Sequence, residues 1–379
     1  MTRNTMIMRR SLVAITCGWG LLASAPARAQ EPVTAPEGTV VEEVEPPPTW
    51  KFKHKDRKVK VVVLAGSIGA WPKQPYAERF MGLCKNVEVK NLSKVGFGAL
   101  QLKQRFKQQF LENPHVNLRD ADNEYWLVFQ GGLNSVGTPE RTNHDIREMF
   151  VLAHAKGLKV VALSLTPWGD DTDRKRWGGV GGLRYQRATR TVVDYVLGTL
   201  TPEQALGEYV GKRAAGAAAP WQAEELPEVA VDLYRSALRD SQAALRDVEA
   251  LRKALEKDRA WQKQHEVLDP AAREAALQAE AEAAAEIPRW FLRADLRSFD
   301  HIHPNTEGHR LIAETACPRL PESWGCDCPP APPGSQPATE EAQPAVANPP
   351  ADAPPRLPTT TLLLLYPHWL RVLLGAPSL

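Results

Sequence analysis

A serine follows the first strongly apolar segment of the sequence, where it could act as a nucleophile. Ser67 lies in Gly66-Ser67-Ile68-Gly69, directly after the β-branched run of residues 58–64. Open α/β sheets place their binding sites at the carboxyl ends of such strands. The same Gly-Ser pair is also common in simple turns, so this segment alone does not indicate catalysis.

A carboxylate and an imidazole that could activate a serine lie near the other end of the chain. Asp300 and His303 precede an amphipathic segment that predicts a helix over residues 305–314. On one short loop, the carboxylate can hold the tautomer of the imidazole while the other ring nitrogen faces a serine. The alternative is that Asp300 caps a turn and His303 is an ordinary surface residue.

Alternating apolar and amphipathic segments predict the elements that would position these side chains. Residues 56–200 alternate β-branched runs with helical patterns, which is typical of a parallel sheet with crossover helices. The predicted strands are residues 58–64, 87–92, 125–130 and 159–165, and the predicted helices are residues 76–83, 99–111, 141–156 and 185–197. Because the strands are continuously apolar, we expect helices on both faces of the sheet.

The chain resembles the SGNH (GDSL-like) hydrolases in four short segments, which occur in the order of that family's blocks. They are Gly66-Ser67, residues 91–96 (NLSKVG), Gly132-Leu133-Asn134, and the segment from Asp300 to His303 with Pro304. The resemblance covers residues 58–316 apart from a helical insertion. It implies a flavodoxin-like three-layer α/β/α sandwich with a parallel sheet.

The resemblance also implies a catalytic triad. Ser67 would attack an acyl carbon, and His303 would take its proton and later deliver it to the leaving group. Asp300 would orient His303. No cofactor and no metal is implied.

An oxyanion hole is the third feature that the resemblance implies. Its donors would be the backbone N–H groups of Ser67 and Gly96 and the side-chain amide of Asn134. Gly98 competes with Gly96 for this role, and the spacing from Asn91 favours Gly96.

Two positions depart from the family's pattern. Gly66 replaces the usual Asp before the nucleophile, and Ser135 replaces the usual Asp after the third-block Asn. Neither position has one of the catalytic roles, so the departures do not exclude activity.

A further strand end supplies a candidate substrate contact. Trp168 follows the strand of residues 159–165 and is either a platform for a sugar or acyl group or a structural aromatic. The acidic residues 170, 171 and 173 could suggest a cation site, but such runs are usually solvated loops.

Composition predicts a helical insertion over residues 202–286. This stretch is rich in Ala, Glu, Arg and Leu and lacks strand signals. Leucines at three- and four-residue steps favour an antiparallel helical pair, and the alternative is a lid or partner-binding coiled coil. We expect the insertion to be separable from the sheet.

The start of the chain predicts export, and both ends differ in composition from the predicted domain. Residues 1–29 have a basic start, an apolar run and a small-x-small site before Gln30, which is typical of a secretory signal; a twin-arginine signal is the alternative. Residues 30–55 read as a Pro-rich linker, and residues 319–379 as a Cys/Pro-rich tail that is not folded. A disulfide from Cys317 to Cys326 or Cys328 is plausible, whereas Cys84 has no assigned partner.

These features together predict an exported serine esterase, periplasmic or extracellular, that hydrolyses an O-acyl ester of a small molecule or polysaccharide. The alternatives are an inactive module that binds glycan or protein and an O-acyltransferase with the same triad. Contact with the envelope or with a protein could use the insertion or the apolar residues of the tail. The net charge of +2 gives no reason to expect nucleic acid.

Overall fold

The computed structural model describes residues 50–169, 179–240, 246–287 and 289–330. The predicted signal peptide, most of the linker, the acidic residues 170, 171 and 173, and the apolar end of the tail lie outside the described residues.

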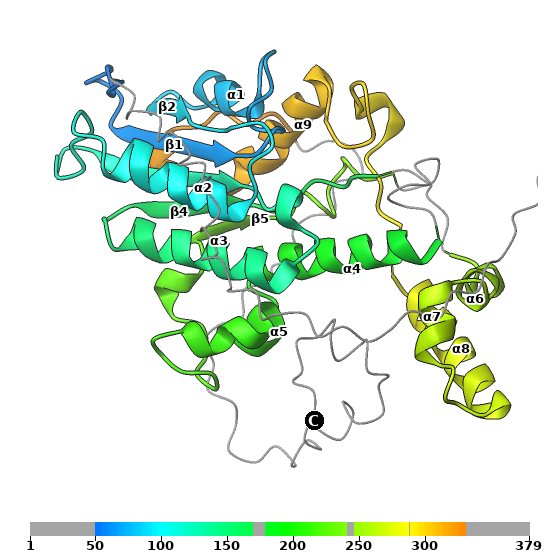
Figure 1. Ribbon diagram of the computed structural model, residues 1–379. Helices are drawn as coiled ribbons and strands as arrows, with labels where there is room; N and C mark the ends of the chain where they lie inside the picture. The colour runs from blue at the N-terminus through cyan, green and yellow to red at the C-terminus, as the bar shows by residue number, and fades with distance from the viewer. Residues whose placement is uncertain (1–49, 170–178, 241–245, 288, 331–379) are drawn as a thin grey trace, which may run out of the picture. The chain divides into compact units, whose positions relative to one another are not determined.

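A five-stranded parallel sheet forms the centre of the fold (Figure 1). Its strands are β1 (Val59–Ala65), β2 (Val87–Asn91), β3 (Glu124–Gln130), β4 (Lys159–Leu163) and β5 (Val229–Val231). Their order, β2-β1-β3-β4-β5, is the flavodoxin-like order. The predicted fold class is confirmed, and the four predicted strands are found within two residues of their expected ends.

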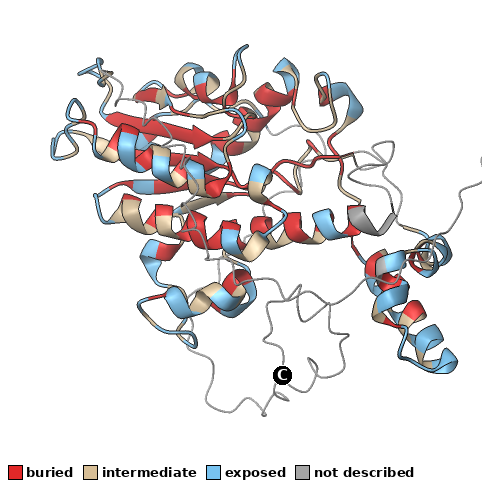
Figure 2. Cartoon of the chain, in the orientation of Figure 1, coloured by how far each residue is buried: buried red, intermediate tan, exposed pale blue. Residues whose placement is uncertain are grey.

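Helices cover both faces of the sheet, and as a consequence every residue of β1 is buried (Figure 2). Val62 and Leu64 point into a core formed with helices α2 (Ala99–Phe106), α3 (Pro139–His154) and α4 (Gly179–Val196). Val61 and Val63 point the other way, into a core formed with α1 (Tyr76–Leu83) and α9 (Thr306–Ala316). The alternation of a strand's side chains therefore divides the interior into two apolar layers.

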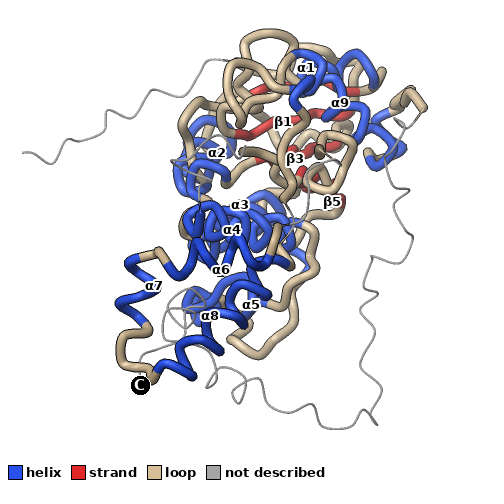
Figure 3. The backbone as a smooth tube through the Cα atoms, turned by 90° about the vertical axis from the view of Figure 1, so that its right-hand side faces the viewer, coloured by secondary structure: helices blue, strands red, loops and turns tan. Residues whose placement is uncertain are grey.

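Several of the helices, which are drawn in blue in Figure 3, begin at recognisable sequence signals. Pro occupies the first turn of α3, α5 and α8, and side-chain oxygens of Asp247, Asp258, Asp269 and Asn305 cap α6, α7, α8 and α9. The bounds are α1 Tyr76–Leu83, α2 Ala99–Phe106 with a π-helical continuation Lys107–Leu111, α3 Pro139–His154, α4 Gly179–Val196, α5 Pro202–Leu206, α6 Val248–Glu256, α7 Arg259–Gln264, α8 Pro270–Ala285 and α9 Thr306–Ala316.

The prediction that residues 202–286 are a wholly helical insertion is wrong. Val229–Val231 form β5, which pairs with β4 at the edge of the sheet. The strand is only three residues long, so its apolar run Val229-Ala230-Val231 is too short to predict a strand from the sequence alone. Residues 202–231 therefore belong to the sheet domain.

The separable excursion is shorter and starts later. Asp240 N donates to Phe291 O at 2.8 Å, and Arg239 forms a bridge with Leu292, so the chain leaves and returns at neighbouring points. Between them, α6 and α8 pack through Leu251, Leu255, Leu277 and Ala281 onto a small apolar cluster that Leu183 of α4 joins. The predicted helical pair is present here.

The folded domain extends beyond the predicted boundary at both ends. Trp50 stacks on Phe110 at 5.9 Å, so the fold already includes residues that were assigned to the linker. At the other end, Trp324 is fully buried against Phe80 and Trp126. The described start of the tail is therefore part of the core.

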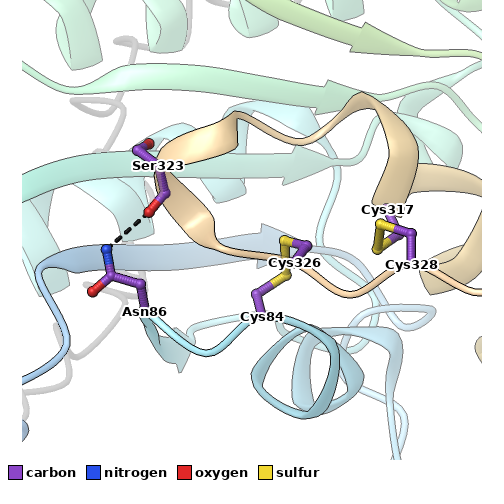
Figure 4. The surroundings of a disulfide bond; sticks show 6 residues. All are labelled: Cys84, Asn86, Cys317, Ser323, Cys326 and Cys328. Carbon is purple, nitrogen blue, oxygen red and sulfur yellow. Dashed lines mark hydrogen bonds between the residues drawn. A yellow bond between two sulfur atoms is a disulfide. The ribbon is translucent and has the colours of Figure 1, made fainter.

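Two disulfides fasten this C-terminal segment (Figure 4). Cys317 pairs with Cys328, which is one of the two pairings expected from the sequence. Cys84 pairs with Cys326, a partner that the sequence did not indicate. Among the described residues, no helix is long and apolar enough to cross a membrane.

Candidate active site

The candidate catalytic side chains lie where the chain leaves the carboxyl ends of the strands. Ser67 follows β1 and Asn134 follows β3, and these two strands are neighbours in the sheet although β2 separates them in sequence. In this strand order, the crevice between β1 and β3 is where open α/β sheets bind ligands. The loop before α9 brings Asp300 and His303 to Ser67.

A continuous hydrogen-bond chain joins the three residues. His303 Nε2 lies 2.8 Å from Ser67 Oγ, and His303 Nδ1 lies 2.8 Å from Asp300 Oδ2. Both distances fall within the range expected of a nucleophile, its base and the group that orients the base. The side chain of His303 is 16% exposed and that of Asp300 29% exposed, so solvent reaches the triad.

The loop that carries Asp300 is shaped by the same carboxylate. Asp300 Oδ1 accepts the backbone N–H groups of Ile302 at 2.9 Å and His303 at 2.8 Å, while Oδ2 faces the His303 ring. Burial alone would raise the pKa of Asp300, but these hydrogen bonds and the attraction of His303 hold that pKa below its usual value. The carboxylate is therefore ionised when it orients the imidazole.

The proposed oxyanion donors differ in how closely they border Ser67. Asn134 lines the same small hollow as Ser67, and its Nδ2 donates one hydrogen to Phe97 O at 3.0 Å, which leaves its second amide hydrogen for a ligand. Gly96 has a φ of +81° and lies outside that hollow's lining; within the described residues its N–H has no hydrogen-bond partner. The N–H of Gly98 is occupied by Gln101 Oε1, which favours Gly96 over Gly98.

The two departures from the family's pattern have local explanations. A Cβ atom at Gly66 would lie 3.2 Å from Asn134 Nδ2, so glycine leaves that amide undisturbed. Ser135 Oγ accepts the N–H of Ala99 at 3.1 Å and bonds to Gly132 O at 3.2 Å. Ser135 thereby ties the start of α2 to the loop after β3.

The assignment of Trp168 as a substrate platform is wrong. Its side chain is buried in the core, and its Nε1 donates to Thr189 Oγ1 at 2.9 Å. Because its ring faces are covered and its N–H is satisfied, it fits the structural alternative.

Two aromatic residues beside the triad were missed. Trp71 and Phe299 stack with each other and with the His303 ring at centroid distances of 5.4–6.2 Å and interplanar angles of 13–23°. Each is close in sequence to a triad residue, since Trp71 follows Ser67 by one turn and Phe299 precedes Asp300. That proximity was the available signal.

A buried histidine packs against Trp71 on the side away from solvent. His309 of α9 is fully buried and stacks on Trp71 at 5.6 Å and on Tyr76 at 6.1 Å. Burial, with the nearby positive charge of Arg79, lowers the pKa of His309 to about 3, so this ring is neutral. Within the described residues, no group of three or more His, Cys, Asp or Glu side chains could hold a metal ion.

No protein-family model matches the chain, and no curated protein matches it in sequence. A lipolytic protein of the G-D-S-L family from Veillonella parvula DSM 2008 has 12% identity and a TM-score of 0.36, over 68% of this chain and 96% of its own. A GDSL-like lipase from Bacteroides thetaiotaomicron VPI-5482 has 14% identity and a TM-score of 0.37, over 69% and 86%.

A catalytic mutant of an acetylxylan esterase from Geobacillus stearothermophilus has 12% identity and a TM-score of 0.33, over 69% of this chain and 93% of its own. Identities and TM-scores this low do not assign an activity to the chain. Its function has to be inferred from the geometry of its own site.

Proposed function

We propose that the chain is an exported serine esterase that removes a short acyl group, such as acetyl, from a carbohydrate. The observation that carries the proposal is the hydrogen-bond chain from Ser67 Oγ through His303 to Asp300, with both links at 2.8 Å. A nucleophile, a base and an orienting carboxylate at the edge of a parallel sheet are the requirements of acyl transfer through a serine.

The first half of the reaction forms an acyl-enzyme. Ser67 Oγ bonds to the acyl carbon while His303 Nε2 takes the hydroxyl proton. The carbonyl oxygen becomes negative and accepts hydrogen bonds from the N–H groups of Ser67 and Gly96 and from the Asn134 amide. The bond from the acyl carbon to the alcohol oxygen then breaks, and His303 gives its proton to that oxygen.

Water completes the cycle. It attacks the acyl carbon as His303 takes one of its protons, the bond to Ser67 breaks, and His303 returns the proton to Ser67 Oγ. The partial exposure of His303 and Asp300 supports hydrolysis over transfer to a second alcohol, because water can reach the acyl-enzyme.

The size of the hollow beside Ser67 supports a short acyl group. Its cavity volume is about 10 Å³, close to the smallest volume that holds a single water. Gly132, Leu133 and Leu165 are among the residues that close it. A hollow this small favours the shortest acyl groups, because a longer chain would have to displace these residues.

Export is supported by two independent features. The first residues have the pattern of a secretory signal. The four cysteines that follow that segment form two disulfides, which persist in oxidising compartments outside the cytosol.

A series of p-nitrophenyl esters tests the proposal. We expect the purified chain to hydrolyse the acetate and to lose activity steeply from butyrate to octanoate, and we expect Ser67→Ala to abolish turnover of all of them. Ser135→Ala is the matched control, because its hydroxyl has a structural contact instead of a catalytic one. Equal rates for wild type and Ser67→Ala would contradict the esterase function and favour the alternative, an inactive module that binds glycan or protein.

A further inference from the structure

The reaction geometry fixes which side of the site the alcohol must occupy. His303 Nε2 delivers a proton to the alcohol oxygen as the ester bond breaks, so this oxygen has to lie beside the His303 ring. The acyl group and the oxyanion lie on the other side, towards Asn134 and the small hollow. A side chain that lies beside the solvent-exposed side of the His303 ring is therefore expected to contact the alcohol part of the ester.

An exposed aromatic side chain flanks His303. Phe299 is 79% exposed, and its ring lies 5.4 Å from the His303 ring at an interplanar angle of 23°. Trp71, which is partly buried, stacks against Phe299 at a centroid distance of 6.2 Å and an angle of 13° and supports it. The three rings are nearly parallel and lie beside the nucleophile.

The backbone on both sides of Phe299 is fixed by hydrogen bonds within the loop of the triad. Ser298 N donates to His303 O at 2.9 Å, and Asp300 bonds back to the backbone of Ile302 and His303. A rigid loop that presents a large apolar ring to solvent is organised for contact with a ligand, because the ring gains nothing from its exposure in the free protein.

We propose that Phe299, supported by Trp71, forms a platform on which the ring of the leaving alcohol stacks, and that this ring is a pyranose. The inference rests on the proposed esterase function and adds the recognition of its alcohol. A pyranose has one face of C–H groups that packs on an aromatic ring, while its hydroxyl groups remain in water.

The surroundings favour a sugar over a lipid alcohol. The exposed large apolar side chains of the described residues are Val95, Tyr185, Val267, Leu268 and Phe299. In the part of the chain that the structure describes, Phe299 offers an aromatic surface the size of one ring beside the triad, without the contiguous apolar area that binds an acyl lipid.

Three acetate esters with different alcohols test the platform: a methyl xylopyranoside acetate, phenyl acetate and ethyl acetate. We expect Phe299→Ala to lower the ratio of kcat/KM for the sugar ester to that for ethyl acetate by about tenfold, mainly through KM. Phe299→Trp should restore the ratio, because it keeps an aromatic face. Val267→Ala, another exposed apolar side chain, is the matched control and should leave the ratio at the wild-type value.

The other outcomes separate the platform from the esterase. A uniform loss on all three esters would overturn the platform, because Phe299 would then act only by holding His303. A loss confined to phenyl acetate would overturn the sugar assignment in favour of an aromatic alcohol. If wild-type protein hydrolysed none of the three, the proposed function itself would fail and the platform with it.

Discussion

Asp300 performs two tasks with one carboxylate. Oδ1 fixes the loop through the N–H groups of Ile302 and His303, and Oδ2 fixes the tautomer of the His303 ring. Loss of the whole carboxylate would disturb both the loop and the ring. A substitution that keeps an acceptor for the backbone N–H groups, but replaces the oxygen that faces His303 and removes the charge, separates the two tasks.

Asp300→Asn is that change. The Asn side-chain oxygen can still accept the two backbone N–H groups, but its NH₂ group would face His303 Nδ1 and impose the wrong tautomer. We expect kcat to fall by about 10³–10⁴-fold, with only a small fall in the thermal unfolding temperature, because the loop hydrogen bonds remain while the favourable charge of Asp300 is lost. Steady-state kinetics and calorimetry on the same preparation check this, and a fall in kcat of less than tenfold would contradict the role of Asp300.

The excursion between Asp240 and Phe291 is the element whose boundaries matter most for engineering. Its ends meet at a backbone hydrogen bond of 2.8 Å, so a short Gly-Ser bridge can replace residues 241–289. The stretch that sequence composition delimits, residues 202–286, would instead remove β5 and Glu225. Glu225 pairs with Arg147 at 3.1 Å and with Arg213 at 2.6 Å in the sheet domain.

The two deletions should therefore behave differently. Replacement of residues 241–289 should leave one cooperative unfolding transition and esterase activity, because β5 and the triad remain. Replacement of residues 202–286 should abolish cooperative unfolding, because Arg147 loses its buried partner and β4 its neighbour. Circular dichroism during urea unfolding compares the two deletion variants, and identical behaviour of both would refute the revised boundary.

Within the excursion, one carboxyl group couples stability to pH. Burial, together with the negative charge of Asp258, raises the pKa of Glu280 to about 7, against the opposing effects of Trp261 Nε1 at 3.2 Å and of Arg187. Folding thus favours the protonated form of Glu280. The stabilisation is complete below the unfolded pKa of 4.5 and is lost as the pH rises through about 7.

Glu280→Gln should remove this dependence, because glutamine keeps an acceptor for Trp261 without a charge. We expect the urea midpoint of the variant to exceed that of the wild type at about pH 8 and to match it at about pH 5. Glu282→Gln, at an exposed position of the same helix, controls for net charge. A gain of the same size at both pH values would show that Glu280 does not titrate in this range.

At the scale of the whole molecule, elements that have a local sequence pattern were predicted, and features that depend on contacts between distant residues were not. The four long strands and the segment before α9 were predictable because apolar runs and caps are local signals. The three-residue strand β5 was not, since it is defined by its pairing with β4. Trp168 was misassigned for the same reason, because only packing shows that its ring is covered.

The C-terminal segment shows how a long-range contact completes the domain. Asp327 N donates to Leu83 O at 2.8 Å, and Lys85 and Asn86 donate to Gly325 O and Trp324 O, both at 3.2 Å. Asn86 Nδ2 also donates to Ser323 O at 2.8 Å (Figure 4). These contacts lie beside the Cys84–Cys326 disulfide, so this bond closes most of the domain into one loop.

The two disulfides should therefore differ in what they contribute to stability. They span 242 and 11 residues, for which the chain-entropy relation gives about 5.5 and about 3 kcal/mol. We expect the Cys84→Ala/Cys326→Ala variant to lose more free energy of unfolding than the Cys317→Ala/Cys328→Ala variant, and both to remain folded because the backbone contacts persist. Urea unfolding of the two variants and the wild type measures the difference. The reverse order would show that packing around Cys317, and not closure of the long loop, sets the stability of this end of the chain.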